Sequence, residues 1–175
     1  MAITLYHGSR RWNGPPQIQK GGKGRTEHGP GIYLTTSAAR AKRYGKVMRV
    51  TLAEDLRMIE DATLPRADAL AYARTMRKRA DLVDELEWYI AQLRPNQDLP
   101  ASRLVNLAVN NEALGGGEAP RMAAWLSSRG IDASLVTWFS GTQAEDWLVV
   151  FNTEKILRVE EARGPHDDAP LLRSV

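Results

Sequence analysis

The chain has 175 residues, of which 43% are hydrophobic, with no cysteine and a formal net charge of +3. This length predicts one compact domain with a sizeable core, and the missing cysteines exclude disulfides, thiolate zinc sites and cysteine nucleophiles. No apolar run approaches the roughly 20 residues that cross a bilayer and no secretory signal opens the sequence, so we expect a cytoplasmic protein with no membrane partner.

The first third of the chain predicts three short strands around a long loop. Strands are expected at 3–7, 32–35 and 47–52, and a helix is expected at 37–44. Ser37 is a favourable N-cap for that helix and Gly45 is a favourable stop. The loop at 12–31 is rich in glycine and proline. Loops of this length inside a compact domain are often functional.

The middle of the chain predicts helices, and the last third returns to strands. Helices are expected at 66–93, 101–114 and 120–129, strands at 131–139 and 147–151, a turn at Gly141-Thr142, and a continuation of the last strand at 157–159. The layout predicts a single α+β domain over residues 1–163, with a helical insert at about 66–129. Residues 164–175 are expected to form a flexible tail.

Several common enzyme motifs are missing from the sequence. The glycine-rich segment 21–26 lacks the GxxxxGK[ST] spacing of a P-loop, and Glu27 stands where a GxGxxG motif needs its last glycine. A GxSxG elbow and an HExxH pair are also missing, and His7, His28 and His166 are scattered along the chain. These patterns predict an enzyme or binding protein that uses no metal.

Three short motifs remain as candidates for a site. His7 ends the first strand beside Gly8, where a missing side chain leaves the backbone open to a flat ligand. Tyr33 on the second strand and Tyr44 on the following helix could hold an aromatic ring between them. The third motif places acidic side chains, at 145–146, directly before the last convincing strand.

Taken one at a time, these residues are more often structural than functional. A histidine at a strand end commonly has a structural role, and tyrosines commonly pack within the core. The pair Glu145-Asp146 is typical of a solvated turn. The order of the three motifs along the chain is what favours a site.

That order resembles the ADP-ribosyltransferase family, in the histidine–tyrosine–acid branch that includes poly(ADP-ribose) polymerases and diphtheria-toxin-like enzymes. The matching segments are Tyr6-His7-Gly8-Ser9, Gly31-Ile32-Tyr33-Leu34-Thr35 and the helix through Tyr44. Segments 129–132 and 146–152 resemble the closing strands of small bacterial and phage-encoded members. The resemblance covers roughly residues 2–53 and 122–157, and it implies a split mixed or antiparallel sheet.

The resemblance implies a role for each matching residue. His7 would hydrogen-bond the adenosine ribose of NAD, and the backbone of Gly8, next to Ser9, would bind the nicotinamide carboxamide. Tyr33 would stack on the nicotinamide ring and Tyr44 would cover its other face. An acid on the late strand would hold the nicotinamide ribose and stabilise the positive charge that develops as the glycosidic bond breaks.

The sequence departs from the family pattern at this acid. Alignment of the closing strand puts Trp147 at the usual glutamate position, and Asp146 and Glu145 lie directly before it. We expect Asp146 to be the catalytic acid because it abuts the strand, with Glu145 second, since the turn at 143–145 also resembles the Q-x-E turn of arginine-modifying relatives. Ala41 stands where a serine is often found three residues before the second tyrosine.

The charge is distributed unevenly along the chain. Residues 1–50 carry ten Lys or Arg and one acid, a net of +9, whereas residues 51–175 have a net of −6. Some of these cations, including Arg25, are expected to bind the pyrophosphate of NAD, and the surplus suggests a polyanionic acceptor. The alternative is that folding brings the basic and acidic parts of the chain together.

These observations predict a small mono-ADP-ribosyltransferase that consumes NAD and modifies a protein, RNA or DNA acceptor. Among family members of this size, a bacterial or phage toxin or effector is typical, which implies a possible antitoxin or immunity partner. Three alternatives stay open: a basic nucleic-acid-binding module without catalysis, a non-catalytic NAD-binding domain, and an NAD glycohydrolase in which water is the acceptor.

Overall fold

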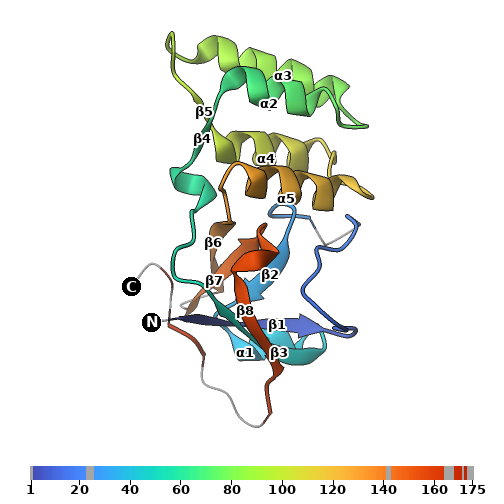
Figure 1. The fold of residues 1–175 in the computed structure, drawn as a ribbon, viewed down its shortest axis with the longest axis vertical. Coiled ribbons are helices and arrows are strands. Elements are labelled where there is room, and N and C mark those ends of the chain that lie inside the picture. The colour runs from blue at the N-terminus through green and yellow to red at the C-terminus, as the bar shows by residue number, and fades with distance from the viewer. Residues whose placement is uncertain (1, 23–25, 141–142, 164–167, 171, 173–175) are drawn as a thin grey trace.

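A six-stranded sheet with every pairing antiparallel forms the base of the protein (Figure 1). The computed structural model describes residues 2–22, 26–140, 143–163, 168–170 and 172. The strands of the sheet are β1 (Ile3–Ser9), β2 (Ile32–Thr35), β3 (Lys46–Leu52), β6 (Ala133–Ser140), β7 (Gln143–Val150) and β8 (Ile156–Glu161), in the spatial order β6-β7-β2-β1-β3-β8. Together with the helices described next, this sheet confirms the expected α+β class.

The sheet is weakly joined in its middle, between β1 and β2. Seven consecutive residue pairs join β1 to β3, from Ile3 opposite Leu52 to Ser9 opposite Lys46. A single aligned pair, Tyr6 opposite Thr35, joins β1 to β2. The sheet therefore consists of two halves, β6-β7-β2 and β1-β3-β8, that diverge beyond Tyr6.

Helices α2 to α5 form layers in the upper half of Figure 1, whereas α1 lies at the bottom, beside β1 and β3. Their bounds are α1 (Ala38–Lys42), α2 (Arg66–Ala73), α3 (Ala80–Gln92), α4 (Ala101–Asn110) and α5 (Glu118–Ser128), with the short strands β4 (Thr63–Leu64) and β5 (Leu99–Pro100) and the single turns η1 (Ile59–Asp61) and η2 (Thr153–Lys155) between elements. The buried faces of α2–α5 share one hydrophobic cluster with Val149 and Phe151 at the end of β7. The helical insert is thus packed onto the sheet and continues its core.

The predicted helix at 66–93 is two helices in the structure. The chain breaks after α2, where Thr75 Oγ1 donates to the carbonyl of Tyr72 (2.7 Å) and Met76 is fully buried. A continuous helix would be about 42 Å long and could not bury both of its ends in a domain of this size. The break folds α3 back beside α2 (Figure 1), which buries Leu82 and Leu86.

The last strand also differs from the prediction. The expected continuation at 157–159 belongs to β8, which pairs with β3 on the far half of the sheet. The turn η2 redirects the chain, and its cap Asn152 accepts a hydrogen bond from Glu154 N through Oδ1 (3.1 Å). The predicted turn at Gly141-Thr142 lies outside the described residues.

The predicted tail lies in part outside the described residues, at 164–167, 171 and 173–175. Of its described residues, Asp168 accepts a hydrogen bond from Ala38 N (2.9 Å) and Ala169 N donates to the carbonyl of Thr36 (2.7 Å). These contacts place residues 168–169 at the start of α1.

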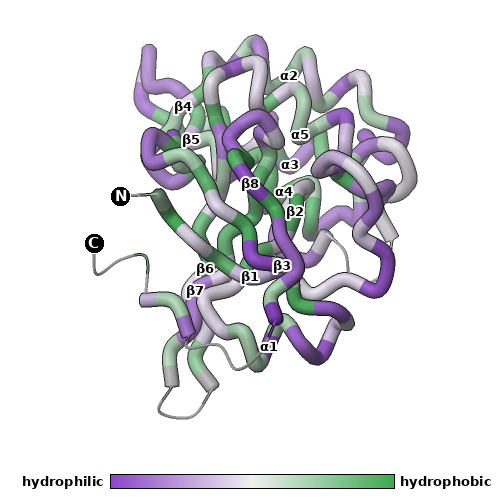
Figure 2. Tube along the Cα trace, turned by 60° about the horizontal axis from the view of Figure 1, so that its bottom comes forward, coloured by the Kyte–Doolittle hydropathy of each residue, from purple (hydrophilic) through white to green (hydrophobic). Residues whose placement is uncertain are grey.

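Figure 2 shows hydrophobic stretches in the strands and inner helices, and hydrophilic stretches mainly in peripheral loops. Within the described residues, no helix combines the length and apolar character needed to cross a lipid bilayer.

Candidate functional site

A cleft of about 980 Å³ opens where β1 and β2 diverge. Its walls come from the end of β1, the loop that follows, β2, α1 and the β6–β7 hairpin. The volume is at the upper end of the roughly 300–1,000 Å³ of typical ligand sites. Six of the residues singled out in the sequence line this cleft: His7, Gly8, Ser9, Tyr33, Tyr44 and Glu145.

His7 bridges the two halves of the sheet. Its Nδ1 lies 2.8 Å from the backbone carbonyl of Tyr33. A carbonyl can only accept a hydrogen bond, so Nδ1 carries the proton and Nε2 of the neutral ring is left as an acceptor. Burial lowers the pKa of His7, against a smaller opposing effect of the bond to Tyr33, and this favours the neutral ring. Trp12 packs edge-on against the imidazole at 5.1 Å between ring centroids.

Gly8 lets α1 approach β1 closely. A Cβ at this position would lie 1.9 Å from the carbonyl oxygen of Ala41 and 2.9 Å from Cβ of Tyr44. A side chain at this position would point at the helix, so glycine is needed here for the close packing of α1. The sequence suggested a different reason, an open approach of the backbone to a ligand. Ser37 caps α1 as predicted, since its Oγ accepts from Arg40 N (3.3 Å).

Three aromatic rings meet in the cleft. Tyr33 and Tyr44 both contact the indole of Trp147, at centroid distances of 6.5 and 6.1 Å and interplanar angles of 69° and 89°. The hydroxyl of Tyr33 accepts from His28 N and donates to the carbonyl of Gly29, both at 2.9 Å. Burial raises the pKa of Tyr33 to about 12, so its phenol stays neutral. The two tyrosines thus both contact a third ring, which the sequence analysis did not place in the site.

The pleat of β7 separates the two candidate acids. Glu145 and Trp147 lie on the cleft face of the strand, whereas Asp146 points to the opposite face. The side chain of Asp146 is buried, at 1% exposure, and its carboxylate accepts hydrogen bonds from Thr137 Oγ1 (2.8 Å) and Leu172 N (2.6 Å). The preference for Asp146 is therefore corrected: Glu145 is the acid that the structure places beside His7 and the tyrosines.

Two side chains hold the carboxylate of Glu145. Trp147 Nε1 donates to Oε1 at 2.7 Å, and Arg40 Nε lies 3.0 Å from Oε1 and 3.2 Å from Oε2. Both partners were missed as site residues, although signals for them exist. Arg40 is four residues before Tyr44, on one face of the helix predicted at 37–44, and Trp147 is two residues after Glu145 on one strand face.

The rest of the lining includes basic and aromatic side chains. Arg10 and Arg11 are exposed and line the cleft together with Arg40, and Glu27 is the other acid among its described lining residues. Arg25, expected to bind a pyrophosphate, lies outside the described residues. Trp138 lines the cleft, contacts the ring of His28 at 6.5 Å and is half exposed.

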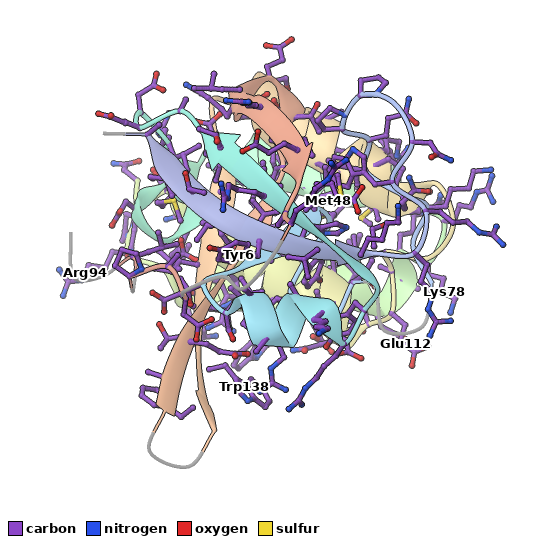
Figure 3. The ribbon with its side chains drawn as sticks, turned by 90° about the horizontal axis from the view of Figure 1, so that it is seen from below. Tyr6, Met48, Lys78, Arg94, Glu112 and Trp138 are labelled. Carbon is purple, nitrogen blue, oxygen red and sulfur yellow. The ribbon has the colours of Figure 1, made fainter. Side chains whose placement is uncertain are left out.

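Figure 3 views the molecule from below and labels Trp138 near α1, with the β6–β7 hairpin projecting from the body. The next residue on that hairpin, Phe139, is 71% exposed.

The assembled groups suit the binding of a polar aromatic ligand and the stabilisation of a cation in it. The cleft offers a neutral imidazole acceptor, three rings, a fixed carboxylate and three arginines. No group of three His, Asp or Glu side chains suited to a metal ion occurs in the part of the chain that the structure describes. Comparison with protein-family models, curated proteins and solved structures finds no match to this chain.

Proposed function

We propose that this protein is a mono-ADP-ribosyltransferase, of the bacterial or phage toxin or effector type. It would cleave NAD, release nicotinamide and transfer ADP-ribose to a macromolecule. One observation carries the proposal: three motifs that lie far apart in the sequence, at His7, Tyr33 and Glu145, line the same cleft. The antiparallel sheet that diverges between β1 and β2 is compatible with the split sheet of the family.

The proposed chemistry assigns binding to the first two motifs. Nicotinamide would stack on Tyr33 and Tyr44, whose rings stand around Trp147. The backbone of Gly8 and Ser9 would bind the carboxamide, and Nε2 of His7 would accept a hydrogen bond from a ribose hydroxyl. Arg10 and Arg11 are placed to meet the pyrophosphate.

The bond that breaks joins C1′ of the ribose to the pyridinium nitrogen. Its electron pair leaves with the nicotinamide, which becomes neutral, and a positive oxocarbenium centre forms on the sugar. The carboxylate of Glu145 stabilises that charge within a partly dry cleft, where its own side chain is 13% exposed. A nucleophilic atom of the acceptor then bonds to C1′ and releases its proton to solvent.

For the acceptor, the surface favours a single-stranded nucleic acid over a protein. Trp138 lines the cleft and is half exposed, and unpaired bases stack on such rings. Arg10 and Arg11 supply positive charge along the same cleft for backbone phosphates.

A second candidate function is a non-catalytic NAD-binding module. The observation that favours it is the ion pair between Arg40 and Glu145, because a paired carboxylate stabilises a cation less well than a free one. This candidate predicts NAD binding without nicotinamide release, and an NAD glycohydrolase predicts release without any labelled macromolecule.

The deciding experiment incubates the protein with labelled NAD and a cell lysate, and then divides the product between ribonuclease, deoxyribonuclease and protease. We expect nuclease to remove the label, and Glu145→Gln to lower nicotinamide release about a hundredfold or more. The matched control is Glu154→Gln, an exposed position on η2 outside the cleft lining, which should behave as wild type. Label removed by protease would make the acceptor a protein, and full activity of Glu145→Gln would refute the site.

A further inference from the structure

Trp147 stands at the position where the sequence departs from the family pattern, and the structure gives it a contact with the acid. Its indole Nε1 donates to Oε1 of Glu145 at 2.7 Å, a short distance for a nitrogen donor and typical of a bond to a charged acceptor. The two residues are neighbours on the cleft face of β7, whose pairing with β6 keeps one register from 143 to 150. The contact is therefore built into a regular strand.

The position of the indole is itself fixed by its neighbours. Tyr33 contacts its ring from β2 and Tyr44 contacts it from the turn after α1, in both cases near edge-on. An indole N–H is a donor only, so once the ring is held it specifies where an acceptor has to be. Trp147 stands where the family pattern has a glutamate, and its N–H fixes the position of Glu145, two residues earlier in the chain.

Arg40 holds the same carboxylate differently. Both contacts to Glu145 come from its Nε, at 3.0 and 3.2 Å, so the pair is not the two-pronged kind in which the terminal nitrogens are used. Among the described residues, the terminal nitrogens of Arg40 have no hydrogen-bond partner. Because Arg40 lines the cleft with Arg10 and Arg11, these nitrogens can bind an anion while Nε stays on Glu145.

We propose that Trp147 is a positioning residue for Glu145, and that Arg40 joins this carboxylate to the diphosphate of the bound substrate. The proposal rests on the proposed function, and it assigns a different role to each of the two side chains that hold Glu145. Trp147 acts on the carboxylate that stabilises the transition state, so its loss lowers kcat. Arg40 acts on the ligand, so its loss raises KM.

The test compares Trp147→Phe with Arg40→Gln by steady-state nicotinamide release, which needs no acceptor. Phenylalanine keeps a ring between the tyrosines and removes the N–H. We expect Trp147→Phe to lower kcat about tenfold or more with KM within about twofold, since hydrogen bonds to charged groups are among the stronger ones. We expect Arg40→Gln to raise KM about tenfold with a smaller change in kcat. Trp88→Phe, at a 68% exposed position on α3, is the matched control and should leave both constants unchanged.

A second readout is independent of activity. The indole N–H resonance that is missing from the NMR spectrum of Trp147→Phe belongs to Trp147. We expect Glu145→Gln to move it upfield, because a neutral amide is a weaker acceptor than a carboxylate, and to leave the Trp88 resonance in place. If Trp147→Phe folds poorly, the resonance is assigned in the wild type by its NOE contacts with the rings of Tyr33 and Tyr44.

The outcomes separate this inference from the proposed function. A wild-type protein that releases no nicotinamide refutes the proposed function before any substitution is made, and the NMR shift still decides whether Trp147 holds Glu145. An active wild type in which the resonance does not move overturns the inference. The inference is also overturned if Trp147→Phe keeps the wild-type kcat, or raises KM and leaves kcat unchanged.

Discussion

At the scale of single residues, the cleft depends on how buried polar atoms are satisfied. The imidazole of His7 spans the divergence of β1 and β2 with one hydrogen bond to the backbone of Tyr33, and the hydroxyl of Tyr33 ties its ring to residues 28–29. The rings of His7 and Tyr33 are thus each fixed by hydrogen bonds to the backbone. Such preorganisation keeps the ligand-facing atoms in place at no cost when a ligand binds.

The burial of His7 makes the stability of the fold depend on pH. Its pKa is lowered below the ordinary value of 6.5, so the unfolded chain binds this proton more tightly than the folded chain. The free energy of unfolding therefore falls as pH drops through 6.5 toward the lower value of the folded state. We expect His7→Asn, whose amide can still donate to the carbonyl of Tyr33, to lose less stability over that interval than wild type.

Urea unfolding at pH 7.5 and at pH 5.0 measures this difference. Titrating carboxylates are common to both proteins and cancel in the comparison. Equal losses in wild type and His7→Asn would mean that His7 is protonated as readily in the fold as in the unfolded chain.

At the scale of elements, α1 links the motifs of the cleft. It packs on Gly8 of β1, carries Arg40 to Glu145 of β7 and ends beside Tyr44, which contacts Trp147. The helix has only five residues, so its position depends on these contacts and on its Ser37 cap. A displacement of α1 would therefore move Arg40 away from Glu145 and Tyr44 away from Trp147 together.

Gly8→Ala tests this linkage. The added Cβ would lie 1.9 Å from the carbonyl oxygen of Ala41, so α1 has to move off the strand. We expect the free energy of unfolding to fall by about 1–3 kcal/mol, and nicotinamide release to fall more than the stability loss explains. Gly115→Ala is the matched control, since its Cβ meets nothing within 4 Å, and it should change stability by less than about 0.5 kcal/mol. Thermal unfolding and initial rates measure both effects, and unchanged activity of Gly8→Ala would contradict the linkage.

Much of the secondary structure could be predicted because its signals are local. β2 at 32–35 matches its prediction, and β1, β3, α4 and α5 differ from theirs by a few residues at their ends. The long helix predicted at 66–93 was wrong because apolar spacing does not show where a chain reverses. Met76 reads as part of the helical pattern, yet it is buried in the turn between two helices.

The candidate site could be predicted only in part, for a similar reason. The order of His7, Tyr33 and Tyr44 along the chain located the cleft lining, whereas the choice between Glu145 and Asp146 depended on the pleat of β7. Distance from the strand favoured Asp146, but alternation from Trp147 assigns Glu145 to the same face. The pairing of β8 with β3 was beyond local signals, since it joins segments about a hundred residues apart.

At the scale of the whole molecule, folding pairs part of the basic first third with acids from the last third. Lys46 and Arg49 on β3 pair with Glu161 and Glu160 on β8, at 3.5 and 3.6 Å, and Arg40 pairs with Glu145. For these cations, folding does bring the basic and acidic parts together. Arg10 and Arg11 line the cleft, and no ion pair links either of them to another described residue. Arg10 and Arg11 thus supply positive charge at the cleft that no acid of the described residues neutralises.

This distribution predicts how binding of a single-stranded nucleic acid depends on salt. Each phosphate contact lowers the logarithm of the affinity by about 0.7 for each tenfold rise in salt. We expect the double variant Arg10→Gln, Arg11→Gln to flatten the slope for a short labelled oligonucleotide by about 1.4, as measured by fluorescence anisotropy. The control is Arg77→Gln with Arg79→Gln, which removes the same charge from the exposed turn between α2 and α3, outside the cleft lining, and should leave the slope unchanged. Equal slopes in all three proteins would show that the cleft arginines do not contact phosphates, and would favour a protein acceptor.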